Sequence, residues 1–191
     1  MNRWILAAVL LLLTACAGHR PQTAPCAELG PGGRLCLLPP SAFPPLRLTH
    51  LVTLDGPQGK QSFLGRLQVG PNAIHVGATS LFGPSLFSIG YDGTRISRQG
   101  GSEQLRPVYL LAVMEFILMR PEQRRSAVDG LEIRLTRDAG RCLLNHGVRV
   151  LCVAPAAADP RQGILRVRLP QADITMTLRP LADTSDRSVT P

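Results

Sequence analysis

The chain has 191 residues, a formal net charge of +8, and 45% hydrophobic residues, a length that suits one domain behind a short leader. The positive charge raises the question of nucleic acid, but apart from Lys60 the basic residues are scattered arginines. Aromatic residues make up 4% of the chain, too few for base-stacking platforms, so we expect no nucleic-acid partner.

The chain opens with a leader typical of a bacterial lipoprotein. Arg3 precedes an uninterrupted apolar run over residues 4–13, long enough for a signal-peptide core but shorter than the roughly 20 residues of a bilayer span. Thr14 and Ala15 are small enough for a peptidase, and Cys16 offers a thiol for acylation. We therefore expect cleavage before Cys16 and anchoring by two or more acyl chains. The alternatives are an ordinary signal peptide with a chance cysteine and an uncleaved membrane helix.

Residues 16–45 are the predicted lipidated N terminus and spacer. They hold seven of the 17 prolines, and proline-rich segments are extended and semi-rigid. Ala17, not aspartate, follows the cysteine. The absence of aspartate directly after the cysteine resembles lipoproteins that are sorted to the outer membrane. We therefore expect the chain in the cell envelope, at the outer membrane and facing the periplasm.

The other four cysteines are an even number in an oxidising compartment, which favours disulfides. Three connectivities are open. We favour the two pairs that close short loops, of which the second is symmetric about Gly147: Cys26–Cys36 and Cys142–Cys152. A metal site is the alternative, but neither a CxxC motif nor a histidine spacing supports one. We expect no metal and no cofactor.

From residue 46 the apolar residues alternate with polar ones, which predicts strands over residues 46–54, 63–69, 74–78 and 87–91. Asp92-Gly93 is a strong hairpin signal, with a return strand over 94–98. These strands share one apolar face, which lines a ligand cavity or belongs to a filled core. The candidate lining residues are Phe63, Leu67, Ile74, Val76, Phe87, Ile89 and Tyr91.

Residues 108–119 break this alternation and predict a helix that is apolar on every side except at Glu115. Pro107 suits its start and Pro121 its end. Such a helix must be buried or must cover an apolar cavity. For Glu115 we favour a solvent-facing position; the alternatives are a pair with an arginine and the polar end of a ligand site. A second short helix is predicted over 122–128.

Alternation resumes over residues 131–135, 165–169 and 174–178, with a hairpin around 145–147. An antiparallel sheet of this size must curl, and the apolar helix suits its concave face. The predicted fold is mainly β with α: a curled antiparallel sheet or incomplete barrel capped by the helix. The predicted divisions are a signal peptide over 1–15, the spacer over 16–45, the domain over 46–180 and a polar tail over 181–191.

Two segments resemble the LolA/LolB-like fold, an incomplete antiparallel barrel with helices in its mouth. They are the strand–loop–strand over residues 79–86 and the helix end over 116–121. Residues 46–178 as a whole resemble a small proteobacterial outer-membrane lipoprotein family of unknown function, often encoded beside aryl polyene or fatty-acid-type biosynthesis genes. The cysteine pairs and the longer spacer depart from the LolB pattern.

The resemblance implies a role for the turn that holds Leu81 and Phe82. Phe82 matches a protruding apolar residue of the LolB group, which implies contact with a membrane or an acyl chain. The alternative is that Phe82 folds back into the core.

The histidines are dispersed, and no GxSxG, HExxH or phosphate-cradling glycine motif occurs. We therefore expect no catalytic residues and no enzyme. The expected function is that of a monomeric outer-membrane lipoprotein that binds or transfers a lipophilic molecule: an acyl chain, a lipoprotein lipid or a polyene lipid. The alternative is a structural accessory subunit of an envelope assembly, with a filled core.

Overall fold

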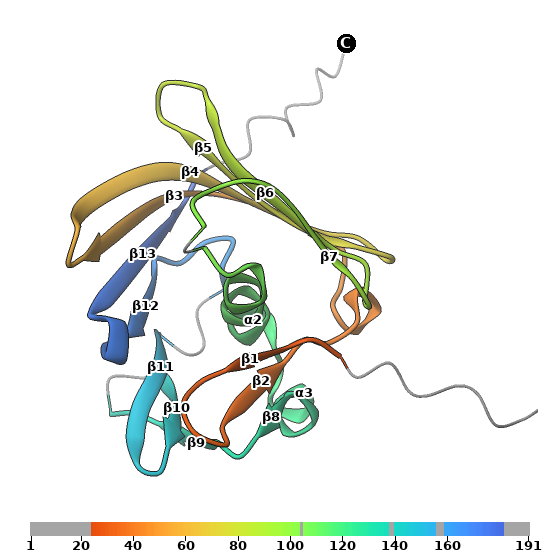
Figure 1. Ribbon diagram of the computed structural model, residues 1–191, viewed down its shortest axis with the longest axis vertical. Helices are drawn as coiled ribbons and strands as arrows, with labels where there is room; N and C mark the ends of the chain where they lie inside the picture. The colour runs from red at the N-terminus through yellow and green to blue at the C-terminus, as the bar shows by residue number, and fades with distance from the viewer. Residues whose placement is uncertain (1–23, 104, 138–139, 156–158, 182–191) are drawn as a thin grey trace, which may run out of the picture.

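The computed structural model describes residues 24–103, 105–137, 140–155 and 159–181. Its main feature is a curved antiparallel sheet of ten strands (Figure 1). The order in which they pair is β7 (Ile96–Gly100), β6 (Ser85–Tyr91), β5 (Ile74–Ser80), β4 (Gly59–Val69), β3 (Leu46–Gly56), β13 (Ile174–Pro180), β12 (Leu165–Leu169), β11 (Val148–Ala154), β10 (Arg141–Asn145) and β9 (Glu132–Leu135). Among these described strands, β7 and β9 are the two edges, so the sheet is not closed.

Two meanders make up this sheet, one before the helices and one after them. The first runs from β3 to β7 and the second from β9 to β13, and they join where β13 pairs with β3. Asp92 shapes the last turn of the first meander: its Oδ1 accepts hydrogen bonds from the backbone N–H groups of Thr94 and Arg95 at 2.9 and 2.7 Å. The predicted Asp92-Gly93 hairpin is confirmed, with Gly93 at φ +96°.

The strands bury one face, as their period-two pattern requires. In β3, Leu48, His50 and Val52 are buried while Arg47 is exposed. The predicted strand regions are confirmed, except that the return strand predicted over 94–98 begins two residues later, at Ile96, because Thr94 and Arg95 belong to the turn. The structure also extends several of them by a few residues, because backbone pairing continues after the apolar pattern ends.

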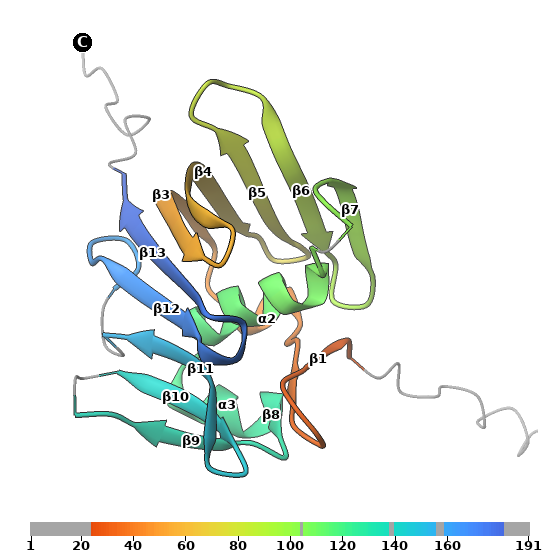
Figure 2. The ribbon, with the colours of Figure 1, turned by 60° about the vertical axis from the view of Figure 1, so that its left-hand side comes forward.

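Helix α2 (Pro107–Leu118) lies on the concave side of the sheet, between its two meanders (Figure 2). Helix α3 (Pro121–Ala127) follows it. Pro107 and Pro121 each stand at the first position of a helix, where a missing N–H costs nothing. Within the described ranges, no helix is both long and apolar enough to cross a membrane.

The described part of the expected spacer is packed against the domain. Strand β2 (Arg34–Cys36) pairs with β1 (Cys26–Glu28) on one side and with β8 (Val128–Asp129) on the other, which makes a small second sheet. The 3-10 helix η2 (Pro40–Ala42) follows β2. A second 3-10 helix, η3 (Pro170–Ala172), joins β12 to β13. Five apolar side chains of this segment are buried in the core: Ala27, Leu29, Leu35, Leu37 and Phe43. From residue 24 on, the segment is therefore part of the fold and not an extended spacer.

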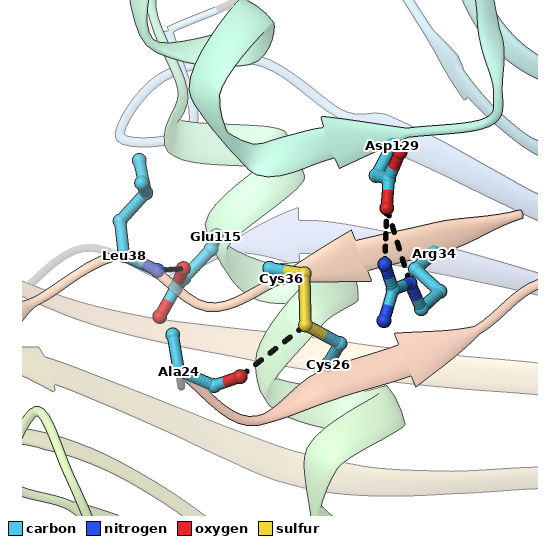
Figure 3. The surroundings of a disulfide bond; sticks show 7 residues. All are labelled: Ala24, Cys26, Arg34, Cys36, Leu38, Glu115 and Asp129. Atoms are coloured by element: carbon cyan, nitrogen blue, oxygen red, sulfur yellow. Dashed lines mark hydrogen bonds and ion pairs between the residues drawn. A yellow bond between two sulfur atoms is a disulfide. The ribbon is translucent and has the colours of Figure 1, made fainter. Parts of the chain in front are cut away.

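Both predicted disulfides are confirmed. Cys26 lies directly opposite Cys36 across β1 and β2 (Figure 3), and Cys142 lies directly opposite Cys152 across β10 and β11. Each bond therefore joins the facing residues of one hairpin. The second hairpin turns at His146-Gly147, where both residues have positive φ angles of 48° and 81°.

Candidate functional site

An apolar cavity of about 60 Å³ lies between α2 and the concave face of the sheet. Strands from both meanders line it, so it spans the junction of β3 with β13. Its strand residues include Leu48, Val52, Leu165, Met176 and Leu178. Its helix residues are Leu110, Met114, Ile117 and Leu118.

The structure divides the seven predicted lining residues into two groups. Four of them line the cavity: Phe63, Leu67, Val76 and Phe87. The other three are almost fully buried in the core beside it: Ile74, Ile89 and Tyr91. All seven share one face of the sheet, but Ile74 pairs with Tyr91 at the end of the strands near η2, where Pro40 approaches Gly93. Alternation predicts the face of a strand and not the position along it.

His50 is the one histidine that lines the cavity among the described residues. Its Nε2 lies 2.8 Å from the carbonyl oxygen of Pro160 and, as an N–H, donates a hydrogen bond to it. Burial lowers the pKa of His50, and the bond to Pro160 opposes that shift only in part. A neutral imidazole satisfied by a backbone carbonyl leaves the cavity without a charge from this side chain.

On the opposite side of α2, Glu115 joins the helix to the N-terminal segment. Its side chain is 1% exposed, and its Oε2 accepts a 2.7 Å hydrogen bond from the backbone N–H of Leu38 (Figure 3). Its Oε1 is buried without a hydrogen-bond partner among the described residues. Burial raises the pKa of Glu115 to about 8, and the bond from Leu38 offsets this in part. The expectation of a solvent-facing Glu115 was wrong.

Two tyrosines add to this polar junction. The hydroxyl of Tyr109 in α2 donates to the carbonyl oxygen of Glu28 in β1. Tyr91 donates to the carbonyl oxygen of Gly93 at 3.0 Å. Burial, and then the nearby carboxylates of Glu115 and Asp92, raise the pKa of Tyr91 to about 12. The N-terminal segment thus contacts α2 through polar groups within an otherwise apolar core.

Arg141 holds the C-terminal end of α2. It is 3% exposed, and its Nη2 donates to the carbonyl oxygens of Phe116 and Ile117, both at 2.7 Å. Its guanidinium also lies over the Phe116 ring, 5.1 Å from the centroid. A cation at this end complements the helix dipole. Burial and the neighbouring Arg124 lower the pKa of Arg141 to about 10. Arg141 was not singled out from the sequence. The alternation of β10 could have indicated it, because Arg141 lies two residues before the buried Leu143 and so on the same face of the strand.

The turn between β5 and β6 presents two apolar side chains to solvent. Phe82 is 96% exposed and Leu81 is 52% exposed. The Ser80 hydroxyl accepts a 3.0 Å hydrogen bond from the N–H of Phe82, and Gly83 adopts a φ of +107° that favours glycine. The turn is thereby fixed with Phe82 pointing outward. The alternative that Phe82 folds into the core was wrong.

The described residues contain no group of three or more histidine, cysteine, aspartate or glutamate side chains placed to hold a metal ion. Four of the cysteines are joined in disulfides. The predicted acylation site, Cys16, lies outside the described residues, as do the predicted signal peptide over 1–15 and nearly all of the predicted polar tail over 181–191.

A family model described as a protein of unknown function, DUF3261, matches residues 47–182. The chain belongs to the DUF3261 family. The match begins within β3 and continues past the end of β13, so it includes α2, the cavity and the Phe82 turn. Strands β1 and β2 and Leu38 precede the DUF3261 match. No curated protein matches the chain in sequence.

Proposed function

We propose that this DUF3261 domain binds a lipophilic molecule, such as an acyl chain, a lipoprotein lipid or a polyene lipid, between α2 and the concave face of the sheet. The observation that carries the proposal is the apolar cavity at this place. Burial of apolar surface contributes about 25 cal/mol per Å², so a long chain needs no specific polar motif for binding.

The size of the cavity sets a condition on this proposal. Its volume of about 60 Å³ is well below the roughly 300–1,000 Å³ of typical ligand pockets. A chain-like ligand therefore enters only if α2 moves away from the sheet. Met114 lines the cavity from the helix, and its unbranched side chain adapts to a new partner more readily than a β-branched one.

The Phe82 turn supports a second part of the proposal. The Phe82 side chain is 96% exposed. Its transfer from water into lipid is favourable, because apolar surface is removed from water. We infer that Phe82 and Leu81 contact a membrane or the acyl chain of a cargo during transfer. Replacing Phe82 with Glu should reduce lipid or lipoprotein transfer without changing the fold, since the side chain makes little contact with the core.

The cellular setting is also proposed from the sequence. We infer that the chain is a lipoprotein acylated at Cys16, bound through that lipid to the outer membrane and facing the periplasm, and that it is a monomer without enzymatic activity. We further propose that its open ten-stranded sheet and apolar helix represent a LolA/LolB-like fold and that its origin is proteobacterial. Mass spectrometry of the chain purified from membranes tests the acylation directly.

An apolar fluorescent probe such as Nile red tests binding in the cavity. Replacing Leu118, which lines the cavity, with Gln should weaken probe binding at least tenfold. The matched control is Val108→Gln, because Val108 is also a half-buried residue of α2 but does not line the cavity. Equal binding by the two variants, or no binding by the unmodified chain, refutes the proposal.

The small volume of the cavity favours a second candidate function. With a core that is nearly filled, the domain would serve as a structural accessory subunit of an envelope assembly. This candidate predicts that delipidated protein binds neither a fatty acid nor the probe, while deletion of the chain destabilises its assembly partners.

A further inference from the structure

A basic hollow lies on the convex face of the sheet, on the opposite side from the cavity. Strand β12 alternates Leu165 and Val167, which are buried in the core, with Arg166 and Arg168, which are exposed on the other face. Together with Arg149 of β11, these arginines line a hollow of about 430 Å³. A second hollow of about 500 Å³ adjoins it and shares Arg149.

The strand register explains why the surface is hollow here. Cys142 lies opposite Cys152, Cys142 also lies opposite Arg134 of β9, and Cys152 lies opposite Arg168. One row across the sheet therefore consists of Arg134, the Cys142–Cys152 disulfide and Arg168. Because the disulfide is much shorter than the side chains beside it, it forms the floor of a depression with cationic walls.

Most of the charge of these walls is not compensated within the described structure. Arg134 is paired with Glu132, with Nη2 2.8 Å from Oε1. Arg149, Arg166 and Arg168 form no ion pair with any described residue, and no acidic residue occurs in β10, β11 or β12. Residues two apart on one strand lie roughly 7 Å from each other on the same face. Such neighbouring like charges repel each other, and a bound anion relieves the repulsion.

Exposed apolar side chains border the same hollows. Ile164 is 51% exposed and lines the first hollow, and Leu135 is 71% exposed and lines the second. A surface that combines cationic and apolar side chains suits the boundary between lipid headgroups and acyl chains. Arginine also binds phosphate oxygens in a bidentate manner, which gives it an advantage over lysine at such a surface.

We propose that this face binds the phosphate-bearing headgroups of anionic membrane lipids, with Arg149, Arg166 and Arg168 on the phosphates and Ile164 and Leu135 in the headgroup boundary. The site is separate from the cavity and does not depend on its occupancy. It also lies at the opposite end of the molecule from the β5–β6 turn that holds Phe82 (Figures 1 and 2). A domain held at this face directs that turn away from the lipid surface.

Phosphorus NMR of the full chain in a non-ionic detergent tests the proposal. Short-chain phosphatidylglycerol should show line broadening that short-chain phosphatidylcholine does not show and that added salt weakens. Each basic residue near an anionic lipid surface contributes about 1 kcal/mol. The triple variant Arg149→Gln, Arg166→Gln, Arg168→Gln should therefore bind phosphatidylglycerol about a hundredfold more weakly.

A second triple variant controls for the net charge of the chain. Arg47→Gln, Arg95→Gln, Arg125→Gln removes the same charge from exposed arginines outside both hollows and should bind phosphatidylglycerol like the unmodified chain. A loss as large in this control as in the first triple variant means that net charge alone attracts the lipid, and it overturns the proposal.

A variant in the apolar border of the hollows provides a third test of the proposal. Ile164→Ser should weaken phosphatidylglycerol binding and leave the weak binding of inorganic phosphate unchanged. If inorganic phosphate binds as tightly as phosphatidylglycerol, the hollow is a site for a free anion and the lipid proposal is overturned. Absence of phosphatidylglycerol binding by the folded, unmodified chain also overturns it.

Discussion

The two sides of α2 are held in different ways. Toward the N-terminal segment, Glu115 and Tyr109 form hydrogen bonds to backbone groups of Leu38 and Glu28. Toward the sheet, the α2 residues that line the cavity are apolar, and Arg141 forms hydrogen bonds to the C-terminal end of the helix. If α2 separates from the sheet, we expect it to keep its contact with the N-terminal segment and with Arg141, because the apolar contacts along the cavity separate without leaving hydrogen-bonding groups unpaired.

The largest expected effect is a difference between leucines on the two sides. Leu35 in β2 is fully buried. Replacing it with Ala should lower the free energy of unfolding by about 2–5 kcal/mol. Replacing Leu118, which is half-buried at the cavity, with Ala should lower the free energy of unfolding by about 1 kcal/mol. Urea unfolding of the two variants measures both. Equal costs would contradict the view that the N-terminal segment belongs to the core.

The two disulfides give the next comparison, because each closes a hairpin of the same sequence separation of 10 residues. Replacing either pair with serines should destabilise the chain by about 3 kcal/mol, from the unfolded-state entropy that the bond removes. Hydrogen exchange should distinguish them. Loss of Cys26–Cys36 should increase exchange of the α2 amides, whereas loss of Cys142–Cys152 should affect β10 and β11. Identical exchange patterns would contradict a specific tie between β1–β2 and α2.

Glu115 predicts a pH dependence of stability. Its pKa is about 8 in the folded chain and 4.5 as an ordinary carboxyl group, so the folded chain holds an extra proton between these values. Its contribution to stability is complete below pH 4.5 and is lost as the pH rises to 8, at no more than about 1.4 kcal/mol per pH unit. Urea unfolding at several pH values measures the slope. Glu115→Gln should flatten it, and an unchanged slope would assign the effect to another group.

The smallest expected effect on stability comes from filling the cavity. Val76→Leu adds one methylene group at a lining position and should change the unfolding free energy by less than about 1 kcal/mol. It should nevertheless reduce the affinity for Nile red severalfold, because it occupies space that a ligand needs. Val113→Leu is the matched control: Val113 is also a buried valine but does not line the cavity. Unaltered affinity in Val76→Leu would place the bound probe elsewhere.

Much of the fold was predictable because its signals are local. Alternation located the strands, proline and glycine located their ends, and the pattern of residues 108–119 predicted α2 to within one residue at each end. The disulfide pairs were predictable because each of them closes a short loop. Each of these inferences depends on residues that are close in sequence, where backbone geometry alone limits the outcome.

The missed features depend on contacts between distant residues. Leu35 and Leu37 lie in a proline-rich segment too short for a clear period, and they are buried because elements distant in sequence pack against them. Glu115 meets a partner 77 residues away, and nothing in its own segment indicates that partner. The cavity shows the same limit, since Ile74 and Val76 share a face and only the three-dimensional packing separates core from lining.

Native mass spectrometry tests the central proposal most directly. The chain should carry Cys16→Ala, so that lipid bound in the cavity is not confused with acyl chains attached covalently. We predict an added mass equal to that of a cellular lipid, released on unfolding and diminished in Leu118→Gln but not in Val108→Gln. A folded chain that shows only its own mass, and that acquires no added mass with fatty acid, would contradict the proposed function.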